Sequence, residues 1–270
     1  MLSFLFWNLN KKPLQARIAR LVVKHGVDIL MLAECVTDPS ELLAALNGTG
    51  GLPYCCPASK APKIRVLTRL PESDLRDQFN DAAGSLTIRE LRLRNARSVL
   101  LAILHFPSKI DWDVHDQTGG AARLAHTIAQ VEGKRWRERT ILVGDFNMNP
   151  FDPGVVSAHA LHGVMTVDVA RRRSREVRME EHPFFYNPMW GCFGDRTPGP
   201  PGSFYLGTSK PVNYFWNIYD QVLLRPGLVD ALRDLAILDT DGSESLLTKA
   251  GLPQTSGGSD HLPLFFQLNL

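Results

Sequence analysis

The chain has 270 residues, 44% of them hydrophobic, and its 30 basic residues nearly balance its 28 acidic ones, for a net charge of +2. This length and composition are enough to bury a large core, and we expect one domain over residues 1–270. The near-neutral balance excludes a protein that holds a polyanion through its overall charge. Binding of such a partner therefore requires a local basic surface.

Residues 2–9 and 27–33 are apolar runs that indicate buried strands, and residues 13–26 between them have the apolar spacing of a helix that stops at Gly26. Further strands are predicted at residues 64–67, 85–93, 99–106, 140–143, 218–224 and 262–268, with a helix at about 121–136. This order of strands and helices is typical of an α/β fold. Residues 180–217, rich in Pro, Gly and aromatics, show no regular pattern and are of a kind that is usually functional or flexible.

The cysteines and the N-terminus bear on where the protein works. The four cysteines have neither metal-ligand spacing nor the framework of a small secreted protein, so we expect reduced thiols. The apolar N-terminus lacks a basic region and a cleavage site and is too short to span a bilayer. We therefore expect a soluble cytoplasmic protein that does not contact membranes. The sequence indicates no obligate oligomer and identifies no protein partner.

Polar residues stand at the ends of several predicted strands. In an α/β sheet, ligands bind where strand ends and their loops converge, so separate strand ends can supply one site. The residues in these positions are Asn8, Glu34, His105, Asp145, Asn147, Asp220, Asp260 and His261.

These residue types fit one reaction. Asn, Asp and Glu supply the oxygen ligands that Mg²⁺ prefers, and histidine handles protons near neutral pH. Hydrolysis of a phosphodiester needs an activated water, neutralised phosphoryl oxygens and a stabilised leaving oxygen. Each residue alone also has a structural explanation, such as an Asx-turn for Asp145 and Asn147. Their joint occurrence favours a single active site.

The stretches FWNLN, LMLAE, LLAILH, ILVGDFNMNP, IYDQVLL and GGSDHLPLFFQL together resemble the endonuclease/exonuclease/phosphatase superfamily, which includes exonuclease III-like and pancreatic-type deoxyribonucleases. The resemblance spans nearly the whole chain, and GDFN and SDH are its most specific parts. It implies a four-layer α/β sandwich of two mixed β-sheets packed face to face, with helices on the outside. It also implies a Mg²⁺ cofactor, for which Mn²⁺ substitutes.

The resemblance further implies a role for each residue of the site. Asn8, Glu34 and Asp260 would hold the metal, and Asp145 would orient or deprotonate the attacking water. Asn147 would position the phosphate, and His105 would hydrogen-bond a phosphoryl oxygen or assist the leaving group. Asp220 would fix the tautomer of His261, which acts on the phosphate or the water.

Two positions depart from the family's pattern. Ala33 stands where a Gln usually precedes the metal-binding Glu, and Gln221 stands where an aromatic or aliphatic residue is common. Neither change removes a catalytic group, but the support around Glu34 differs from the usual one. Arg123 matches a position where family members often carry an arginine, which makes it a candidate for substrate binding.

The sequence features that bear on the substrate are less specific than those that bear on the reaction. The arginine run Arg171, Arg172 and Arg173 precedes an aromatic loop that includes Tyr186 and Trp190, and basic residues near aromatics bind nucleic acid. A solvated charged helix beside locally packed aromatics is an equal alternative. Nucleic acid, DNA or RNA, narrowly leads over inositol phosphates and lipid head groups. A catalytically silent binding module of the same fold is the alternative of another class.

Overall fold

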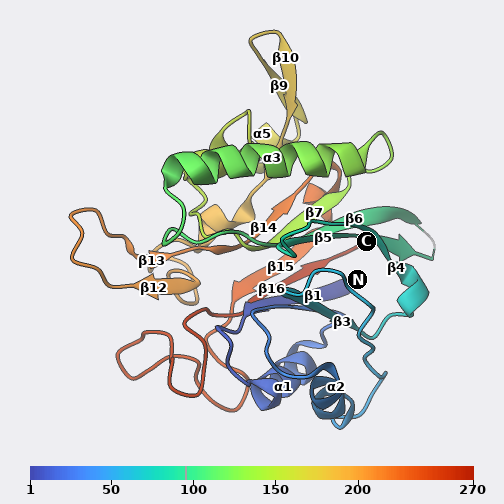
Figure 1. Ribbon diagram of the computed structural model, residues 1–270, viewed down its shortest axis with the longest axis vertical. Coiled ribbons are helices and arrows are strands. Elements are labelled where there is room, and N and C mark those ends of the chain that lie inside the picture. Colours follow the sequence, from blue (N-terminus) through green and yellow to red (C-terminus); the bar gives the residue numbers. More distant parts are fainter. Residues whose placement is uncertain (95) are drawn as a thin grey trace.

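The computed structural model describes residues 1–94 and 96–270 and shows two β-sheets packed face to face (Figure 1). The order of strands is β15-β16-β1-β2-β3 in the five-stranded sheet and β4-β5-β6-β7-β14-β11-β8 in the seven-stranded sheet. Helix α3 covers the outer face of the larger sheet, and α1 and α2 lie on the outer side of the smaller one. The four-layer sandwich of two mixed sheets predicted from the sequence is confirmed.

The five-stranded sheet begins with the apolar N-terminal run. It consists of β1 (Leu2–Asn8), β2 (Ile29–Ala33), β3 (Ile64–Thr68), β15 (Leu232–Ile237) and β16 (Leu264–Leu268). β1 is parallel to β2 and antiparallel to β16. Helix α1 (Gln15–His25) ends as predicted at Gly26, whose φ of 58° is left-handed. Helix α2 (Pro39–Asn47), which the sequence pattern missed, starts at Asp38, whose side chain accepts a hydrogen bond from the backbone of Ser40.

The seven-stranded sheet is built around the parallel pair β6 and β7, with β14 antiparallel to β7. Its strands are β4 (Leu75–Asn80), β5 (Leu86–Leu93), β6 (Ala96–His105), β7 (Thr140–Asp145), β8 (Gly163–Val164), β11 (Phe185–Tyr186) and β14 (Asp220–Leu224). The short helices are η1 (Glu72–Asp74), α4 (Pro153–Val156), α5 (Val167–Ala170), η2 (Pro188–Cys192) and η3 (Pro226–Ala231).

Two hairpins project from the sandwich in different directions. β9 (Ser174–Val177) and β10 (Glu180–Pro183) extend beyond α3 at the top of Figure 1. β12 (Phe204–Leu206) and β13 (Phe215–Asn217) lie at the left of the same view. Residues 180–217, which had no predicted structure, therefore contain β10, β11, η2, β12 and β13. Sequence patterns miss such strands because each has two to four residues and pairs with distant or equally short partners.

Helix α3 (Val114–Glu132) starts earlier and ends earlier than predicted. Its start is set by a capping box in which the Asp113 side chain accepts from Asp116 N and the Asp116 side chain accepts from Asp113 N. Gly120 obscured this start in the sequence, but a Cβ there would lie 2.3 Å from Cζ3 of Trp112, so close packing requires glycine. In the described parts of the chain, no helix combines the length and apolarity that crossing a bilayer requires.

Strand alternation explains why polar side chains face the space between the sheets. On β7, Ile141 and Val143 belong to the core between the two sheets, whereas Leu142 packs under α3. Because side chains alternate along a strand, Asp145 shares the inner face with Ile141 and Val143. The same alternation places His105 and Asp220 on that inner face, at the end of the sandwich where the core stops.

Gly144 brings β7 close to β6 just before Asp145. Its φ is 154°, and a Cβ there would lie 2.0 Å from the backbone oxygen of Leu104. We expect Gly144→Ala to lower the free energy of unfolding by about 3 kcal/mol or more, through backbone strain and overpacking. Urea unfolding measures the loss. Gly191→Ala is the matched control because a Cβ at Gly191 meets no atom within 4 Å. Equal stability of the two variants would contradict this account.

Candidate active site

The site lies where the two sheets end on the same side. In the seven-stranded sheet, Asp145 on β7 is paired with His105 on β6 and with Asp220 on β14. In the five-stranded sheet, Asn8 is the last residue of β1 and Glu34 directly follows β2. The parallel pairings β1–β2 and β6–β7 bring these strand ends to a common edge. Residues far apart in the sequence thereby meet at one place.

The carboxylates of Glu34 and Asp145 face the same point. Nδ2 of Asn8 donates to Oδ2 of Asp145 at 2.9 Å and to Oε1 of Glu34 at 3.5 Å. Nε2 of His105 lies 3.4 Å from Oε1 of Glu34 and 3.8 Å from Oδ2 of Asp145. The hydrogen bond to His105 holds the pKa of Glu34 below its usual value although partial burial opposes it. Glu34 is therefore ionised at neutral pH.

Two residues of the site have left-handed backbones. The φ angles of Glu34 and Asn147 are 49° and 50°, values that non-glycine residues seldom adopt. Such strain persists only where the surroundings over-determine it, and it is typical of functional sites. At Asn147 the backbone N–H donates to Oδ1 of Asp145 at 2.8 Å, and Nδ2 donates to the backbone oxygen of Phe106 at 2.8 Å. The Asx-turn considered for this sequence is thus present, and it orients the carboxylate of Asp145.

Asp220 and His261 form the hydrogen bond predicted from the sequence, with 2.8 Å between Oδ2 and Nδ1. Asp220 is fully buried, and its backbone N–H donates to Oγ of Ser203 at 3.0 Å. Burial by itself lowers the pKa of His261, but the charges of Asp220 and Asp145 outweigh it and raise this pKa to about 10. Nε2 of His261, 3.9 Å from Oδ2 of Asp145, is then left to donate toward the open side of the site.

A cavity of 740 Å³ opens at this edge of the sandwich. Seven of the eight predicted residues line it, namely Asn8, Glu34, His105, Asp145, Asn147, Asp260 and His261, while Asp220 stands behind His261. Sequence reasoning missed three lysines in its wall, Lys63, Lys109 and Lys210. Single lysines in loops carry no pattern that would have pointed to them. They add positive charge to the wall of the cavity.

The donor atoms of the site fit a divalent cation. Asp145, Asp220 and His261 each place one ligand atom within 4.8 Å of the others, but the Asp220–His261 hydrogen bond already occupies part of this group. The carboxylates of Glu34 and Asp145 converge instead on the cavity. Such an oxygen-rich set suits a hard cation, which commonly uses one or two carboxylates together with water and substrate phosphate.

Gln221, one of the two departures from the family pattern, supports the loop behind the site. Its Nε2 donates to the backbone oxygens of Met148 and Ile218, and its Oε1 accepts from Nδ2 of Asn187 at 2.8 Å. Gln221 is fully buried, so this network satisfies an amide that would otherwise be costly. It holds the loop that follows Asp145 against β14.

The arginine run lies away from the cavity. Arg171, Arg172 and Arg173 are exposed beyond the end of α5, and Arg171 pairs with Asp230 of η3 at 2.7 Å. Tyr186 is in register with Leu224, at the opposite end of β14 from Asp220. The structure therefore does not bring these residues to the rim of the catalytic cavity. Their part in binding a longer nucleic acid stays a prediction.

Trp190 and Arg123 also do not line the catalytic cavity. Trp190 packs against Phe151, with 6.2 Å between ring centroids, in an aromatic cluster with Phe193. Arg123 lines a neighbouring cavity of 250 Å³ that shares Phe106 with the larger one.

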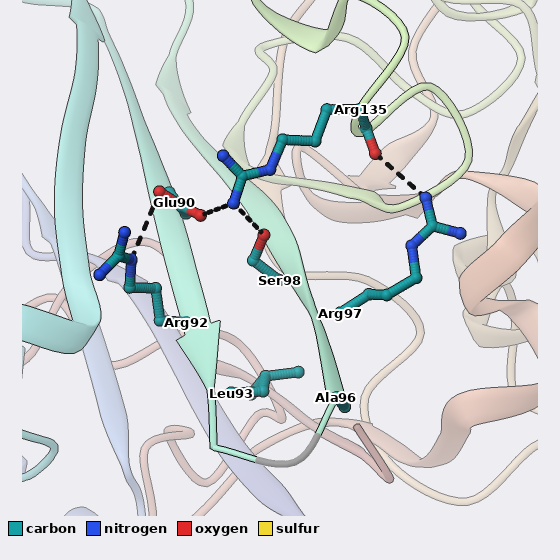
Figure 2. A pocket seen from close by; sticks show the side chains of 7 residues that line it. All are labelled: Glu90, Arg92, Leu93, Ala96, Arg97, Ser98 and Arg135. Carbon is teal, nitrogen blue, oxygen red and sulfur yellow. Dashed lines mark hydrogen bonds and ion pairs between the residues drawn. The ribbon is translucent and has the colours of Figure 1, made fainter.

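A further cavity of 390 Å³ lies at the opposite end of β6, about 30 Å along the strand from His105. Figure 2 shows Arg92 and Arg135 reaching toward Glu90, which is buried, while Arg97 reaches the backbone of Arg135. Glu90 pairs with Arg135 at 2.5 Å and with Arg92 at 3.7 Å, and Arg97 donates to the backbone oxygen of Arg135. These contacts neutralise a buried carboxylate, which accounts for the cluster without a ligand.

Residues 5–261 match the model of the Endonuclease/Exonuclease/phosphatase family. The chain belongs to this family, as the sandwich and the residues at its edge indicate. The resemblance noted in the sequence is thereby confirmed. Among curated proteins, a comparison found no match to this chain.

Solved structures share the fold at low sequence identity. An AP endonuclease from Archaeoglobus fulgidus superposes with a TM-score of 0.58 at 15% identity, covering 100% of both chains. D. rerio TDP2, complexed with a single-strand DNA product, has a TM-score of 0.56 at 14% identity, covering 100% of this chain and 99% of that one. A family protein from Leptotrichia buccalis C-1013-b has a TM-score of 0.58 at 11% identity, covering 100% of both. At these identities the likeness concerns the fold alone.

Proposed function

We propose that this protein is a divalent-metal-dependent phosphodiester hydrolase that acts on nucleic acid. One observation carries the proposal. Two carboxylates, Glu34 and Asp145, and two histidines, His105 and His261, converge on one open cavity from four separate strand ends. Acids, bases and oxygen ligands in such an arrangement serve hydrolysis of a phosphate ester. Membership of the Endonuclease/Exonuclease/phosphatase family supports the same reaction.

Each side chain then has a role in the attack of water on phosphorus. Asp145 orients the water and takes its proton, while Asn147, which lines the same cavity, positions the phosphate. His261, held by Asp220, donates from Nε2 to a phosphoryl oxygen as the new bond from water oxygen to phosphorus forms. His105 lies beside both carboxylates and assists the oxygen that leaves as the ester bond breaks.

Glu34, Asn8 and Asp260 are the residues that would hold Mg²⁺, for which Mn²⁺ would substitute. When bound, the cation would neutralise negative charge on the phosphoryl oxygens. The chain's own contribution is to fix the carboxylates before substrate arrives. Asn8 does this by donating to both Glu34 and Asp145, and Oγ of Ser259 donates to the backbone oxygen of Asn8 at 2.7 Å. A preformed set of this kind loses little free energy to reorganisation during the reaction.

Nucleic acid is the substrate that the cavity wall favours. Lys63, Lys109 and Lys210 line the cavity and would pair with phosphates next to the scissile one, and Phe204 adds an aromatic ring beside His261. Cations interleaved with aromatic rings bind a sugar–phosphate chain and stack its bases. The single-strand DNA product bound to D. rerio TDP2 supports the same class of substrate for this fold.

Inositol phosphates and lipid head groups would use the same chemistry, so the substrate class needs a direct test. The test compares hydrolysis of single-stranded DNA, double-stranded DNA, abasic DNA, RNA and inositol phosphates with Mg²⁺ and with Mn²⁺. The proposal expects cleavage of one or more nucleic acids and little release of phosphate from inositol phosphates. A preference for inositol phosphates over nucleic acids would overturn the substrate assignment but would still support a phosphate ester hydrolase. Absence of cleavage on every substrate would favour a silent binding module.

Lys210 on the β12–β13 hairpin allows a test of nucleic-acid binding through the salt dependence of the affinity. We expect Lys210→Ala to weaken binding of a single-stranded oligonucleotide and to reduce the slope of log K against log salt by about 0.7, the value for one lost phosphate contact. Hydrolysis of bis-p-nitrophenyl phosphate should change much less, because that substrate has no neighbouring phosphate for Lys210 to bind. Lys134→Ala, an exposed lysine beyond the far end of α3, is the matched control. An unchanged salt slope in Lys210→Ala would exclude this contact.

A further inference from the structure

A second group of metal-ligating side chains lies away from the active site, beside the β9–β10 hairpin. His159, Glu180 and His182 each offer one ligand atom, and these atoms all lie within 4.8 Å of one another. Oε2 of Glu180 is 3.9 Å from Nε2 of His182, and the rings of His159 and His182 are 4.9 Å apart at 89°. Two imidazoles and one carboxylate thus converge without any role in the catalytic cavity.

The chain brings these three residues together from two segments. Glu180 and His182 are two positions apart on β10, so strand alternation places both on one face. His159 comes from the loop after α4. The hairpin projects past α3 in Figure 1; Glu180 pairs with Val177 beside the turn at its tip, and His182 pairs with Arg175 nearer its base. A cavity of 230 Å³, lined by His126, His159 and His182, adjoins the group and leaves room for a further ligand.

An unsatisfied nitrogen points to a missing ligand at this place. Nε2 of His182 is buried and has no hydrogen-bond partner among residues 1–94 and 96–270. Buried polar atoms are seldom left in this way, because an unpaired group costs free energy. The neighbouring His162 has no such vacancy, since its Nδ1 lies 3.2 Å from the backbone oxygen of Pro183 and its Nε2 accepts from Arg175 at 3.0 Å. The difference singles out His182 as a ligand.

We propose that His159, Glu180 and His182 bind a divalent transition metal, with Zn²⁺ as the best match. Zn²⁺ favours imidazole nitrogen and completes a tetrahedron with three protein ligands and a water. Mg²⁺ strongly prefers oxygen, so the two sites of the protein select different metals. Binding would add a second tie between the hairpin and the loop after α4, beside the hydrogen bond from Arg175 to His162. The inference is independent of the reaction at the catalytic cavity.

Calorimetric titration of the chelator-treated protein with Zn²⁺, in excess Mg²⁺ to occupy the catalytic cavity, tests this site. We expect one Zn²⁺ to bind per chain, and binding to weaken at least about tenfold in His159→Ala and in His182→Ala. Titration with Co²⁺ should give the visible absorption of a four-coordinate site in the wild type and lose it in both variants. His115→Ala, which removes an exposed histidine outside the group, is the matched control and should bind as the wild type does.

Two further variants make each outcome decisive. Glu180→Gln changes an exposed side chain, so its effect on Zn²⁺ affinity is free of folding defects even if His182→Ala unfolds. Glu34→Gln should leave this Zn²⁺ site intact, because Glu34 belongs to the other cavity. If Glu34→Gln abolishes all Zn²⁺ binding, the ion occupies the catalytic cavity and the proposal fails. The proposal also fails if Glu180→Gln and one of the two histidine variants, measured separately, both bind Zn²⁺ with wild-type affinity.

Discussion

Replacement of Glu34 by glutamine is expected to reduce metal-dependent phosphodiester hydrolysis by at least about two orders of magnitude. The exchange keeps the shape of the side chain but removes its negative charge. In the wild type the hydrogen bond to His105 lowers the pKa of Glu34 and so keeps this carboxylate ionised. Glu34 lines the cavity and its side chain is 26% exposed, so folding does not depend on it. The measurement is turnover of bis-p-nitrophenyl phosphate under saturating Mg²⁺, with thermal unfolding recorded alongside.

Glu41→Gln is the matched control for this change, because Glu41 is an exposed glutamate on α2 far from the cavity. It should retain wild-type turnover. Near-wild-type hydrolysis by Glu34→Gln would show that Glu34 is not part of the catalytic machinery. His261→Ala is a less clean test of the same site, since it would leave Asp220 buried without its partner and lower stability as well.

Replacement of Glu132 by alanine is expected to lower the free energy of unfolding by about 3–5 kcal/mol. Glu132 on α3 and Arg225 after β14 form a two-point ion pair, with 2.8 Å from Nε to Oε1 and 3.0 Å from Nη2 to Oε2. Their side chains are only 2% and 3% exposed. Removal of Glu132 leaves the guanidinium charge buried and unpaired, although its contact with the Phe185 ring remains. Urea unfolding measures the loss.

The Arg171–Asp230 pair supplies the control for burial. Its atoms are 2.7 Å apart, but the two side chains are 56% and 77% exposed. Asp230→Ala should therefore change stability by less than about 1 kcal/mol. A double replacement of Glu132 and Arg225 by methionine should recover much of the loss, because it removes both charges together. Similar stabilities of Glu132→Ala and Asp230→Ala would contradict the importance of the buried pair.

The strand ends of the site could be predicted because each follows or precedes its own apolar run. Asn8, His105 and Asp145 end strands whose last residues the hydrophobic pattern locates within two residues. The hydrogen bond between Asp220 and His261 could be expected only through the family resemblance, since 41 positions separate the two residues. The hydrophobic pattern predicts where each strand ends. Only the family resemblance predicts which of these strand ends lie close together.

The rest of the surroundings depended on pairings that no local pattern contains. The arginine run and the aromatic loop are close in sequence, and that closeness suggested one binding rim. The structure separates them from the cavity because Tyr186 pairs with Leu224 at the far end of β14. The lysines of the cavity wall come instead from three distant loops, one of them the β12–β13 hairpin. Short strands of two or three residues carry too little periodicity to reveal such a hairpin.

The same limit applies to the group of His159, Glu180 and His182. Glu180 and His182 are two positions apart, but His159 lies outside any close, regular spacing by which metal-binding motifs are recognised. It joins them only because β10 folds back beside the loop after α4. His182 attracts notice in the structure through its unpartnered nitrogen, which the sequence does not record.

Hydrolysis of bis-p-nitrophenyl phosphate by the purified protein tests the proposed reaction most directly. The account predicts release of p-nitrophenol with Mg²⁺ or Mn²⁺, complete loss of activity on addition of EDTA, and recovery when excess Mg²⁺ is restored. Asp145→Asn, which alters the carboxylate at the centre of the site, should show no activity with either metal. Hydrolysis that persists in EDTA, or no hydrolysis of any phosphodiester with either metal, would contradict a metal-dependent phosphodiester hydrolase.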